Sequence, residues 1–253
     1  MKTFRFLSSL MLCSLLWVSG RALAADVPSV VLVHGAFADG SNWSKVIPIL
    51  QAKGIQVTAV QMGLDSLSSG VATTRRAIDD QKGRVVLVGH SWGGSVITEA
   101  GQDDKVVALV YVAAFALDAG QSTGEVGKDF PPPPGGQHLV ADSKGWLSLP
   151  PQAFVEDFAP DVPAAQAAVM AVTQGPLQAK AFGDRPSVAA WKTRPSWYIV
   201  SSNDRMIPPD LERAMASKIG ATTTTIASSH VPQLSHPEEV AAVILAAVAA
   251  TTK

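Results

Sequence analysis

The chain has 253 residues, of which 47% are hydrophobic and 16% are charged, and its formal net charge is −1 at pH 7. This composition predicts a globular protein with a large core and excludes a mainly disordered chain. The near-neutral charge argues against nucleic-acid binding, because nucleic-acid binders concentrate basic side chains on one surface.

The first residues of the chain, 1–24, have the three-part pattern of a secretory signal peptide. Basic side chains precede the apolar run 6–18, and small residues provide a cleavage site after Ala24. The apolar run is too short to span a bilayer as a helix, so we expect no membrane anchor after cleavage. The mature chain, 25–253, would lie in the periplasm or the medium. It would lack the single cysteine, Cys13, which excludes disulfides and thiolate metal sites.

Apolar runs alternate with amphipathic stretches from residue 29 onward. This alternation is typical of repeated strand–helix units around a parallel sheet buried on both faces. Strands are predicted at Val30–Val33, Gln56–Val60, Val85–Val88, Val106–Ala113, Trp197–Val200 and Thr223–Ile226. Helices are predicted at 41–53, 70–80, 91–102, 209–218 and 236–250. The predicted fold class is therefore α/β, with a mostly parallel sheet of about six strands flanked by helices.

One region, about 119–186, breaks this alternation and is called the insertion below. No strong strand is predicted in it, and Pro131–Pro134 followed by two glycines forms a stiff segment and then a loose one. Between 150 and 182 the apolar residues have spacings that suit short amphipathic helices. We expect the insertion to form a helical lid on the domain of residues 25–253; an ordinary surface excursion is the alternative.

The segment 89–93, Gly-His-Ser-Trp-Gly, matches the pattern G-x-S-x-G of a serine nucleophile. A buried strand is predicted before it and a helix after it. In such a tight strand-to-helix turn, glycines make room for the chain and the serine oxygen projects from the sheet edge. Ser91 also precedes a helix N-terminus, where amide groups favour a developing negative charge. This context predicts that Ser91 is a nucleophile.

A serine nucleophile needs a histidine base and a carboxylate that orients the histidine. On this kind of sheet the acid and then the base follow the serine in the chain. Asp204 lies in a loop directly after the strand Trp197–Val200 and is the predicted acid. Asp118, after the preceding strand, is the alternative.

Two histidines compete for the role of base. His230 follows the strand Thr223–Ile226 in a short loop, from which a side chain can reach back over the sheet edge. His236 lies beside a proline at a predicted helix start, where a capping or surface role suffices. His138 lies in a segment rich in glycine and proline that offers no such geometry. We therefore predict His230 as the base.

The strand Val30–Val33 ends in His-Gly, and glycine there lets the chain turn so that the next amide points into the site. The backbone N–H groups of Ala36 and Trp92 are the predicted oxyanion hole, in which one donor typically stabilises the transition state by about 3 kcal/mol. His34 and His90 are interpreted as structural residues that hold their loops by hydrogen bonds.

With these elements in order, residues 28–250 resemble the α/β-hydrolase superfamily. The segments 31–43, 89–94 and 229–232 are similar to the small esterase and hydroxynitrile-lyase branch, which includes plant methyl-salicylate esterases. This resemblance implies hydrolysis of carboxylic esters, a helical lid over an apolar pocket, and a triad of Ser91, Asp204 and His230.

These patterns predict a secreted serine carboxylesterase that acts on small apolar or aromatic esters. No phosphate loop, dinucleotide fingerprint or metal-ligand spacing occurs, so no cofactor or metal is expected. A C–C lyase on the same fold is disfavoured because no lysine stands in the oxyanion loop or the serine turn. A weakly hydrolytic ligand-binding protein is disfavoured by the complete triad. The candidate pocket walls are apolar or aromatic: Phe37, Trp92, Trp146, Phe154, Phe158 and Met170.

Overall fold

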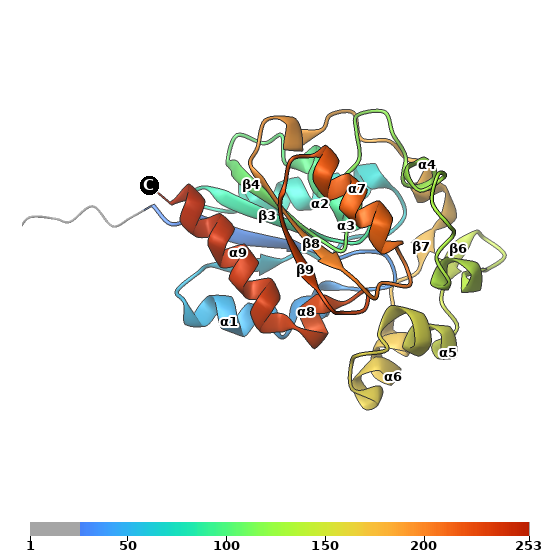
Figure 1. Cartoon of the computed structure of the whole chain (residues 1–253). Helices are drawn as coiled ribbons and strands as arrows, with labels where there is room; N and C mark the ends of the chain where they lie inside the picture. The colour runs from blue at the N-terminus through green and yellow to red at the C-terminus, as the bar shows by residue number, and fades with distance from the viewer. Residues whose placement is uncertain (1–25, 253) are drawn as a thin grey trace, which may run out of the picture.

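The fold is built around a six-stranded, all-parallel sheet with the order β2-β1-β3-β4-β8-β9 (Figure 1). A computed structural model describes residues 26–252, so the predicted signal peptide lies outside the described residues. The strands are β1 (Ser29–Val33), β2 (Val57–Ala59), β3 (Val85–His90), β4 (Val106–Val112), β8 (Ser196–Ser201) and β9 (Thr222–Ile226). The predicted α/β class, with its parallel sheet and flanking helices, is confirmed.

Helices cover both faces of the sheet, which explains the continuous apolar runs of the central strands. In β1, Val30 and Leu32 belong to the core on one face, while Val31 and Val33 belong to the core on the other. The first face is covered by α1 (Val46–Ala52) and α9 (Pro237–Thr251), beside the short η1 (Gly40–Trp43) and α8 (Pro232–Ser235). The second face is covered by α2 (Leu67–Asp79), α3 (Gly93–Ala100) and α7 (Pro209–Lys218).

The helix starts follow from local sequence. Ser66 precedes α2, and its hydroxyl accepts a hydrogen bond from the amide of Ser69, which satisfies one of the free amides of the first turn. Helix α9 begins with Pro237 and has two glutamates in its first turn, in agreement with the predicted start. The residue before it, His236, makes no capping side-chain hydrogen bond.

The insertion lies between β4 and β8 and is grouped at one end of the sheet in Figure 1. It contains a small antiparallel sheet with the order β5-β6-β7. These strands are two or three residues long, too short to produce a readable alternation, so the expectation of short helices misses this sheet. In chain order, the insertion contains α4 (Thr123–Val126), η2 (Gly135–His138), β5 (Val140–Ala141), β6 (Trp146–Ser148), α5 (Pro151–Ala153), the π-helical η3 (Phe154–Phe158), α6 (Ala164–Thr173), β7 (Leu177–Gln178) and η4 (Ala179–Gly183). The short helix η5 (Ala190–Lys192) follows the insertion.

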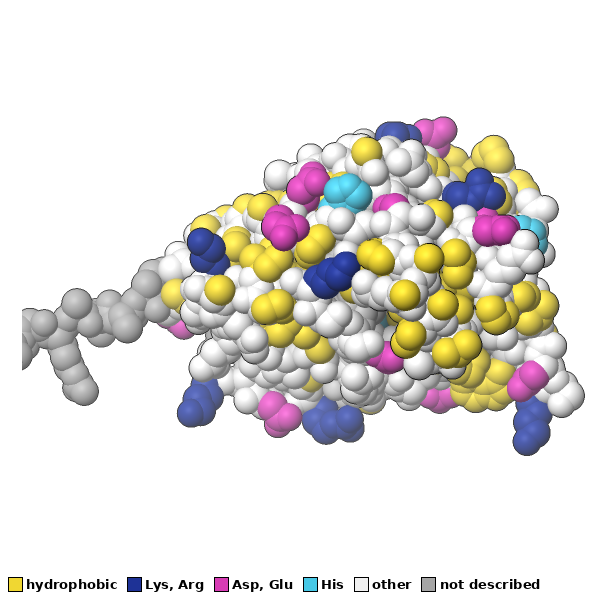
Figure 2. Space-filling view, turned by 90° about the horizontal axis from the view of Figure 1, so that it is seen from below, with side chains coloured by type: hydrophobic (Ala, Val, Ile, Leu, Met, Phe, Trp, Pro, Cys, Tyr) yellow, Lys and Arg dark blue, Asp and Glu magenta, His cyan; other side chains and the backbone are white. Residues whose placement is uncertain are grey.

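The surface of the insertion is partly apolar. Figure 2 shows hydrophobic side chains gathered on the side of the molecule that holds the insertion, with charged side chains scattered over the whole of this face. Val169 and Val172 of α6 are 59% and 75% exposed. Among the helices of residues 26–252, none combines the length and the hydropathy that a membrane span requires.

Candidate active site

Ser91 lies in a sharp turn between β3 and α3. Its φ of +53° is in the left-handed region, which is costly for a residue with a side chain and is typical of functional turns. The turn is packed tightly enough to require its flanking glycine: a Cβ on Gly93 would lie 2.5 Å from the carbonyl oxygen of His34. The tight packing of this turn thus holds Ser91 in a left-handed backbone conformation at the end of β3.

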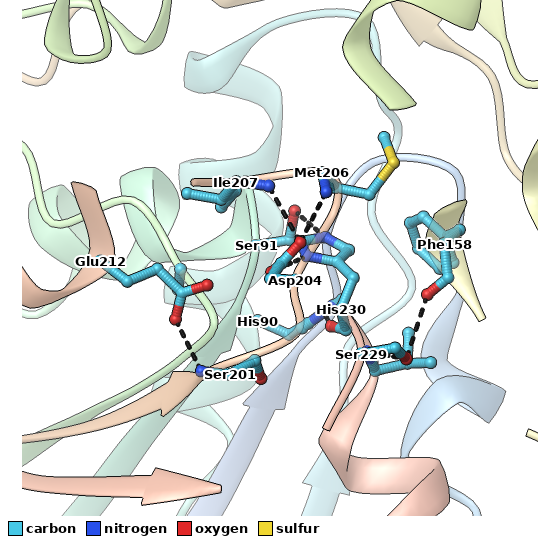
Figure 3. Close-up of polar contacts among 12 residues, drawn as sticks. His90, Ser91, Phe158, Ser201, Asp204, Met206, Ile207, Glu212, Ser229 and His230 are labelled. Carbon is cyan, nitrogen blue, oxygen red and sulfur yellow. Dashed lines mark hydrogen bonds and ion pairs between the residues drawn. The ribbon is translucent and has the colours of Figure 1, made fainter. Parts of the chain in front are cut away.

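Ser91, His230 and Asp204 form a continuous hydrogen-bonded relay (Figure 3). Ser91 Oγ lies 2.9 Å from His230 Nε2, and His230 Nδ1 lies 2.6 Å from Asp204 Oδ2. The other oxygen of Asp204 accepts hydrogen bonds from the amides of Met206 at 2.6 Å and Ile207 at 2.9 Å. Asp204 therefore keeps the proton of the neutral imidazole on Nδ1, so that Nε2 can accept the serine proton.

The alternatives weighed from the sequence lie elsewhere. Asp118 pairs with Lys192 at 3.4 Å and Lys218 at 3.2 Å on the surface. His236 contacts Ser235 Oγ at the start of α9. His138 pairs with Asp157 of the insertion. The structure brings neither Asp118 nor these two histidines into the relay.

The amides of Ala36 and Trp92 are placed to hold an oxyanion. Both residues are almost fully buried, and among residues 26–252 neither amide has a backbone or side-chain acceptor. Buried amides without a partner are rare because their desolvation is costly. The neighbouring Phe37 amide, in contrast, donates to the carbonyl of Gly175 in the insertion at 3.0 Å. Ala36 lines the same cavity as Ser91, and Trp92 follows Ser91 in the chain, so these two amides remain the predicted oxyanion hole.

His34 and His90 have the structural roles that the sequence suggested. His34 Nδ1 donates to the carbonyl of Gly35 at 2.8 Å, and its Nε2 accepts from the amide of Met62 at 3.0 Å. His90 Nε2 donates to the carbonyl of His230 at 2.7 Å. Burial lowers the pKa of His34 and, together with the nearby His230 ring, holds the pKa of His90 well below its usual range. The lowered pKa values favour neutral rings, and both rings hold the backbone around the site by hydrogen bonds.

Glu212 of α7 is a buried carboxyl group that sequence reasoning missed. It is fully buried, and its Oε2 accepts a hydrogen bond from the amide of Ser201 at 3.0 Å. Burial raises the pKa of Glu212 well above its usual range, and the adjacent Asp204 carboxylate raises it further. The raised pKa favours the neutral form of Glu212, and its hydrogen bond fixes the end of β8, three residues before Asp204. Its position among apolar residues on one side of α7, near Leu211 and Met215, is the signal that could have identified it.

A largely apolar cavity of about 480 Å³ opens at Ser91 and His230. Phe37 and Ala36 line it near the serine, and Lys128 is the lining residue with a charged ammonium group. The remaining wall is dominated by apolar side chains from the insertion, from the loops that follow β4 and β8, and from α7: Phe115, Phe130, Leu139, Phe182, Met206 and Leu211. Apart from the reacting groups, the cavity therefore favours apolar ligands.

Most of the predicted pocket walls lie elsewhere, and Phe37 alone of that set lines the cavity. Trp92, Phe154 and Phe158 are fully buried in the core. Trp146 lines a separate surface hollow beside the small sheet, and Met170 lines a second cavity of about 210 Å³. The helical spacing included buried side chains such as Phe154 and Phe158, but it also included Val169 and Val172, which are exposed. It could not distinguish side chains that pack in the core from those that border a cavity.

The described residues include no group of three or more His, Cys, Asp or Glu side chains placed to bind a metal ion. The chemistry of the site is instead that of a nucleophile, a base and an oxyanion hole beside an apolar cavity. This arrangement can transfer an acyl group to Ser91 and then to water.

Comparison with known proteins agrees with this geometry. Residues 30–243 match the alpha/beta hydrolase family, and the chain belongs to this family as an enzyme of the carboxylesterase type. It is similar to a pyrethroid hydrolase of Sphingobium wenxiniae, with 27% identity over 86% of each chain. It is also similar to Methylesterase 2 of Arabidopsis thaliana, with 38% identity over 40% of this chain and 44% of that one.

A solved structure shows the same fold. The crystal structure of a pyrethroid hydrolase from Sphingobium faniae matches with a TM-score of 0.77 and 23% sequence identity, over 89% of this chain and 98% of that one. The likeness thus extends over the sheet, its helices and much of the insertion.

Substitution of Gly35 tests the packing that sets the oxyanion hole. A Cβ at this position would lie 2.6 Å from Ser91 Cβ and 3.1 Å from Ser91 Oγ. We expect Gly35→Ala to displace the nucleophile and to lower kcat/KM for ester hydrolysis by about 100-fold, because small displacements of reacting atoms have effects of this size. Gly183→Ala, whose Cβ would meet nothing within 4 Å, serves as the control. Equal activity of the two variants would contradict this packing argument.

Substitution of Glu212 tests its neutral state. The folded protein retains the Glu212 proton to a higher pH than the unfolded chain, which loses it above the ordinary pKa of 4.5. Wild-type stability therefore falls as pH rises above this value. Glu212→Gln removes this dependence, so we expect its stability relative to wild type to increase with pH, by at most about 1.4 kcal/mol per unit. Urea unfolding between about pH 5 and pH 8 measures the difference, and a difference independent of pH would refute a raised pKa.

Proposed function

We propose that the protein hydrolyses carboxylic esters with apolar or aromatic groups through an acyl-enzyme on Ser91. The observation that carries this proposal is the relay of 2.9 Å and 2.6 Å contacts from Ser91 through His230 to Asp204, which opens into an apolar cavity. A cavity of about 480 Å³ is within the range that holds small organic ligands. The similarity to proteins named as a pyrethroid hydrolase and a methylesterase supports an ester substrate.

Acylation begins when Ser91 Oγ attacks the ester carbonyl carbon and its proton passes to His230 Nε2. The carbonyl oxygen becomes an oxyanion that accepts hydrogen bonds from the Ala36 and Trp92 amides. Asp204 stabilises the imidazolium, because its carboxylate accepts a hydrogen bond from the Nδ1–H group, which keeps its proton. When the intermediate collapses, the bond to the leaving oxygen breaks and His230 donates its proton to the alcohol.

Deacylation repeats these steps with water. His230 takes a proton from the water molecule as the oxygen attacks the acyl carbon, and the second oxyanion occupies the same pair of amides. Collapse of this intermediate releases the carboxylic acid and returns the proton from His230 to Ser91 Oγ. No group other than water is consumed, so the cycle needs no cofactor.

A panel of p-nitrophenyl esters with acyl groups of increasing size tests this function. We expect turnover that favours apolar acyl groups over small polar ones, and we expect Ser91→Ala to lower kcat/KM by at least about 10⁴-fold. Ser217→Ala, on the exposed side of α7, is the control and should retain wild-type rates. Turnover that survives Ser91→Ala would overturn the assignment of the nucleophile, and absence of turnover for the whole panel would overturn ester hydrolysis.

We also propose that the enzyme acts outside the cytoplasm after removal of residues 1–24. The support is the sequence pattern of a basic start, an apolar run and small residues before Ala25. Expression of the full chain in an export-competent bacterium should yield a periplasmic or extracellular protein whose N-terminal sequence begins at Ala25. Ala22→Phe, which places a large side chain in the cleavage site, should leave the leader attached. Wild-type protein that begins at Met1 in the cytoplasm would contradict this proposal.

A further inference from the structure

The loop that carries His230 is held by the insertion through the residue directly before it. The amide of Ser229 donates to Asp161 Oδ2 at 2.7 Å, and the hydroxyl of Ser229 donates to the other carboxylate oxygen of Asp161. The same hydroxyl lies 3.5 Å from the carbonyl oxygen of Phe158 (Figure 3). Asp161 lies between η3 and α6. One carboxylate of the insertion therefore accepts hydrogen bonds from both the amide and the hydroxyl of Ser229.

The imidazole of His230 is also packed against the insertion. The rings of Phe158 and His230 meet edge to face, with centroids 5.0 Å apart and an interplanar angle of 69°. On the side of the domain, His90 Nε2 donates to the carbonyl of His230 at 2.7 Å. The base is thus fixed by the domain through its own carbonyl and by the insertion through its ring and the preceding residue.

The contact with Asp161 is distinct from the other anchors of this loop. Ser228 is held by the loop after β8, because its carbonyl accepts from the Asn203 amide at 3.0 Å and its hydroxyl donates to Ser201 Oγ at 3.0 Å. Ser229 is 2% exposed, whereas Asp161 itself is exposed. Without Asp161 the Ser229 amide would lose a charge-assisted hydrogen bond, which water or a movement of the loop would have to replace.

We propose that Asp161 is a positioning residue that aligns His230 with Ser91 and thereby makes proton transfer depend on the seating of the insertion. This inference rests on the proposed function, in which His230 is the base. Asp161 lines neither the cavity at Ser91 nor the second cavity beside Phe37, so it acts through Ser229 and not on the substrate. The same segment that encloses the substrate would therefore complete the alignment of the base.

The chemistry of the contact predicts the order of three variants. Asp161→Ala removes both acceptors of Ser229. Asp161→Asn keeps an acceptor for the Ser229 amide and can donate to the Ser229 hydroxyl, which is able to accept. Glu156→Ala removes a carboxylate of η3 that bonds to Gln152 and not to the base loop, and it serves as the matched control.

The first measurement is the rate at which a fluorophosphonate labels Ser91, since this rate reports proton transfer to His230 without a particular ester. We expect Asp161→Ala to lower the labelling rate about tenfold or more, and Asp161→Asn and Glu156→Ala to stay within about twofold of wild type. With the preferred ester, kcat should fall by the same factor and KM should change little. Thermal melting confirms that each variant is folded.

If Asp161→Ala does not fold, Asp161→Glu replaces it, because one added methylene displaces the acceptors while the charge is kept. Labelling of a folded Asp161→Ala or Asp161→Glu variant at the wild-type rate would overturn the proposal, as would a loss confined to melting temperature or KM. An inert ester panel with normal labelling of wild type would instead contradict the proposed substrate and leave the labelling test of Asp161 valid.

Discussion

The close approach of the loop after β1 to the turn after β3 is the constraint on which the site depends. There is no room for a side chain at Gly35, which faces Ser91 Cβ and Oγ, or at Gly93, which faces the carbonyl of His34. This contact brings the Ala36 amide beside the nucleophile and holds Ser91 at a φ of +53°. The strain of that conformation costs free energy of the order of 1–3 kcal/mol, which the surrounding parallel strands, buried on both faces, can offset.

Burial also selects which ionisable groups carry charge. The site contains three buried histidines, but His34 and His90 are kept neutral by desolvation and are committed to backbone partners. His230 alone among them has a carboxylate partner, at 2.6 Å. Of the two buried carboxyl groups near the end of β8, Glu212 has a raised pKa that favours its neutral form, whereas Asp204 accepts hydrogen bonds from two amides and from His230 Nδ1. Of the three buried histidines, only the one that faces the serine oxygen therefore has a carboxylate that can stabilise an imidazolium during the reaction.

The sequence predicts the strands and the reacting residues of this site better than it predicts the residues that line the cavity. The strands and the positions of Ser91, Asp204 and His230 could be inferred because parallel strands bring their carboxyl ends to one edge, so that residues just after strands become neighbours. No such rule exists for the insertion, whose strands are two or three residues long. Phe158 was predicted to border the substrate, yet it packs on His230, because a period of 3.6 residues reports inward direction and not the neighbour. Asp161 and Glu212 escaped notice because each depends on a tertiary partner, Ser229 or Ser201, remote in the chain.

The insertion therefore contains two sets of residues, those that line the cavity and those that contact the His230 loop, and substitutions are tolerated differently in the two sets. Residues such as Phe130 and Phe182 line the cavity with apolar surface, and changes there alter the binding free energy of an apolar ligand by about 1–3 kcal/mol per methylene. Residues that face the base loop, Phe158 and Asp161, contact the reacting machinery, where a displacement of one ångström has larger consequences. A substrate pocket can then be remodelled through the first set only while the second keeps its place.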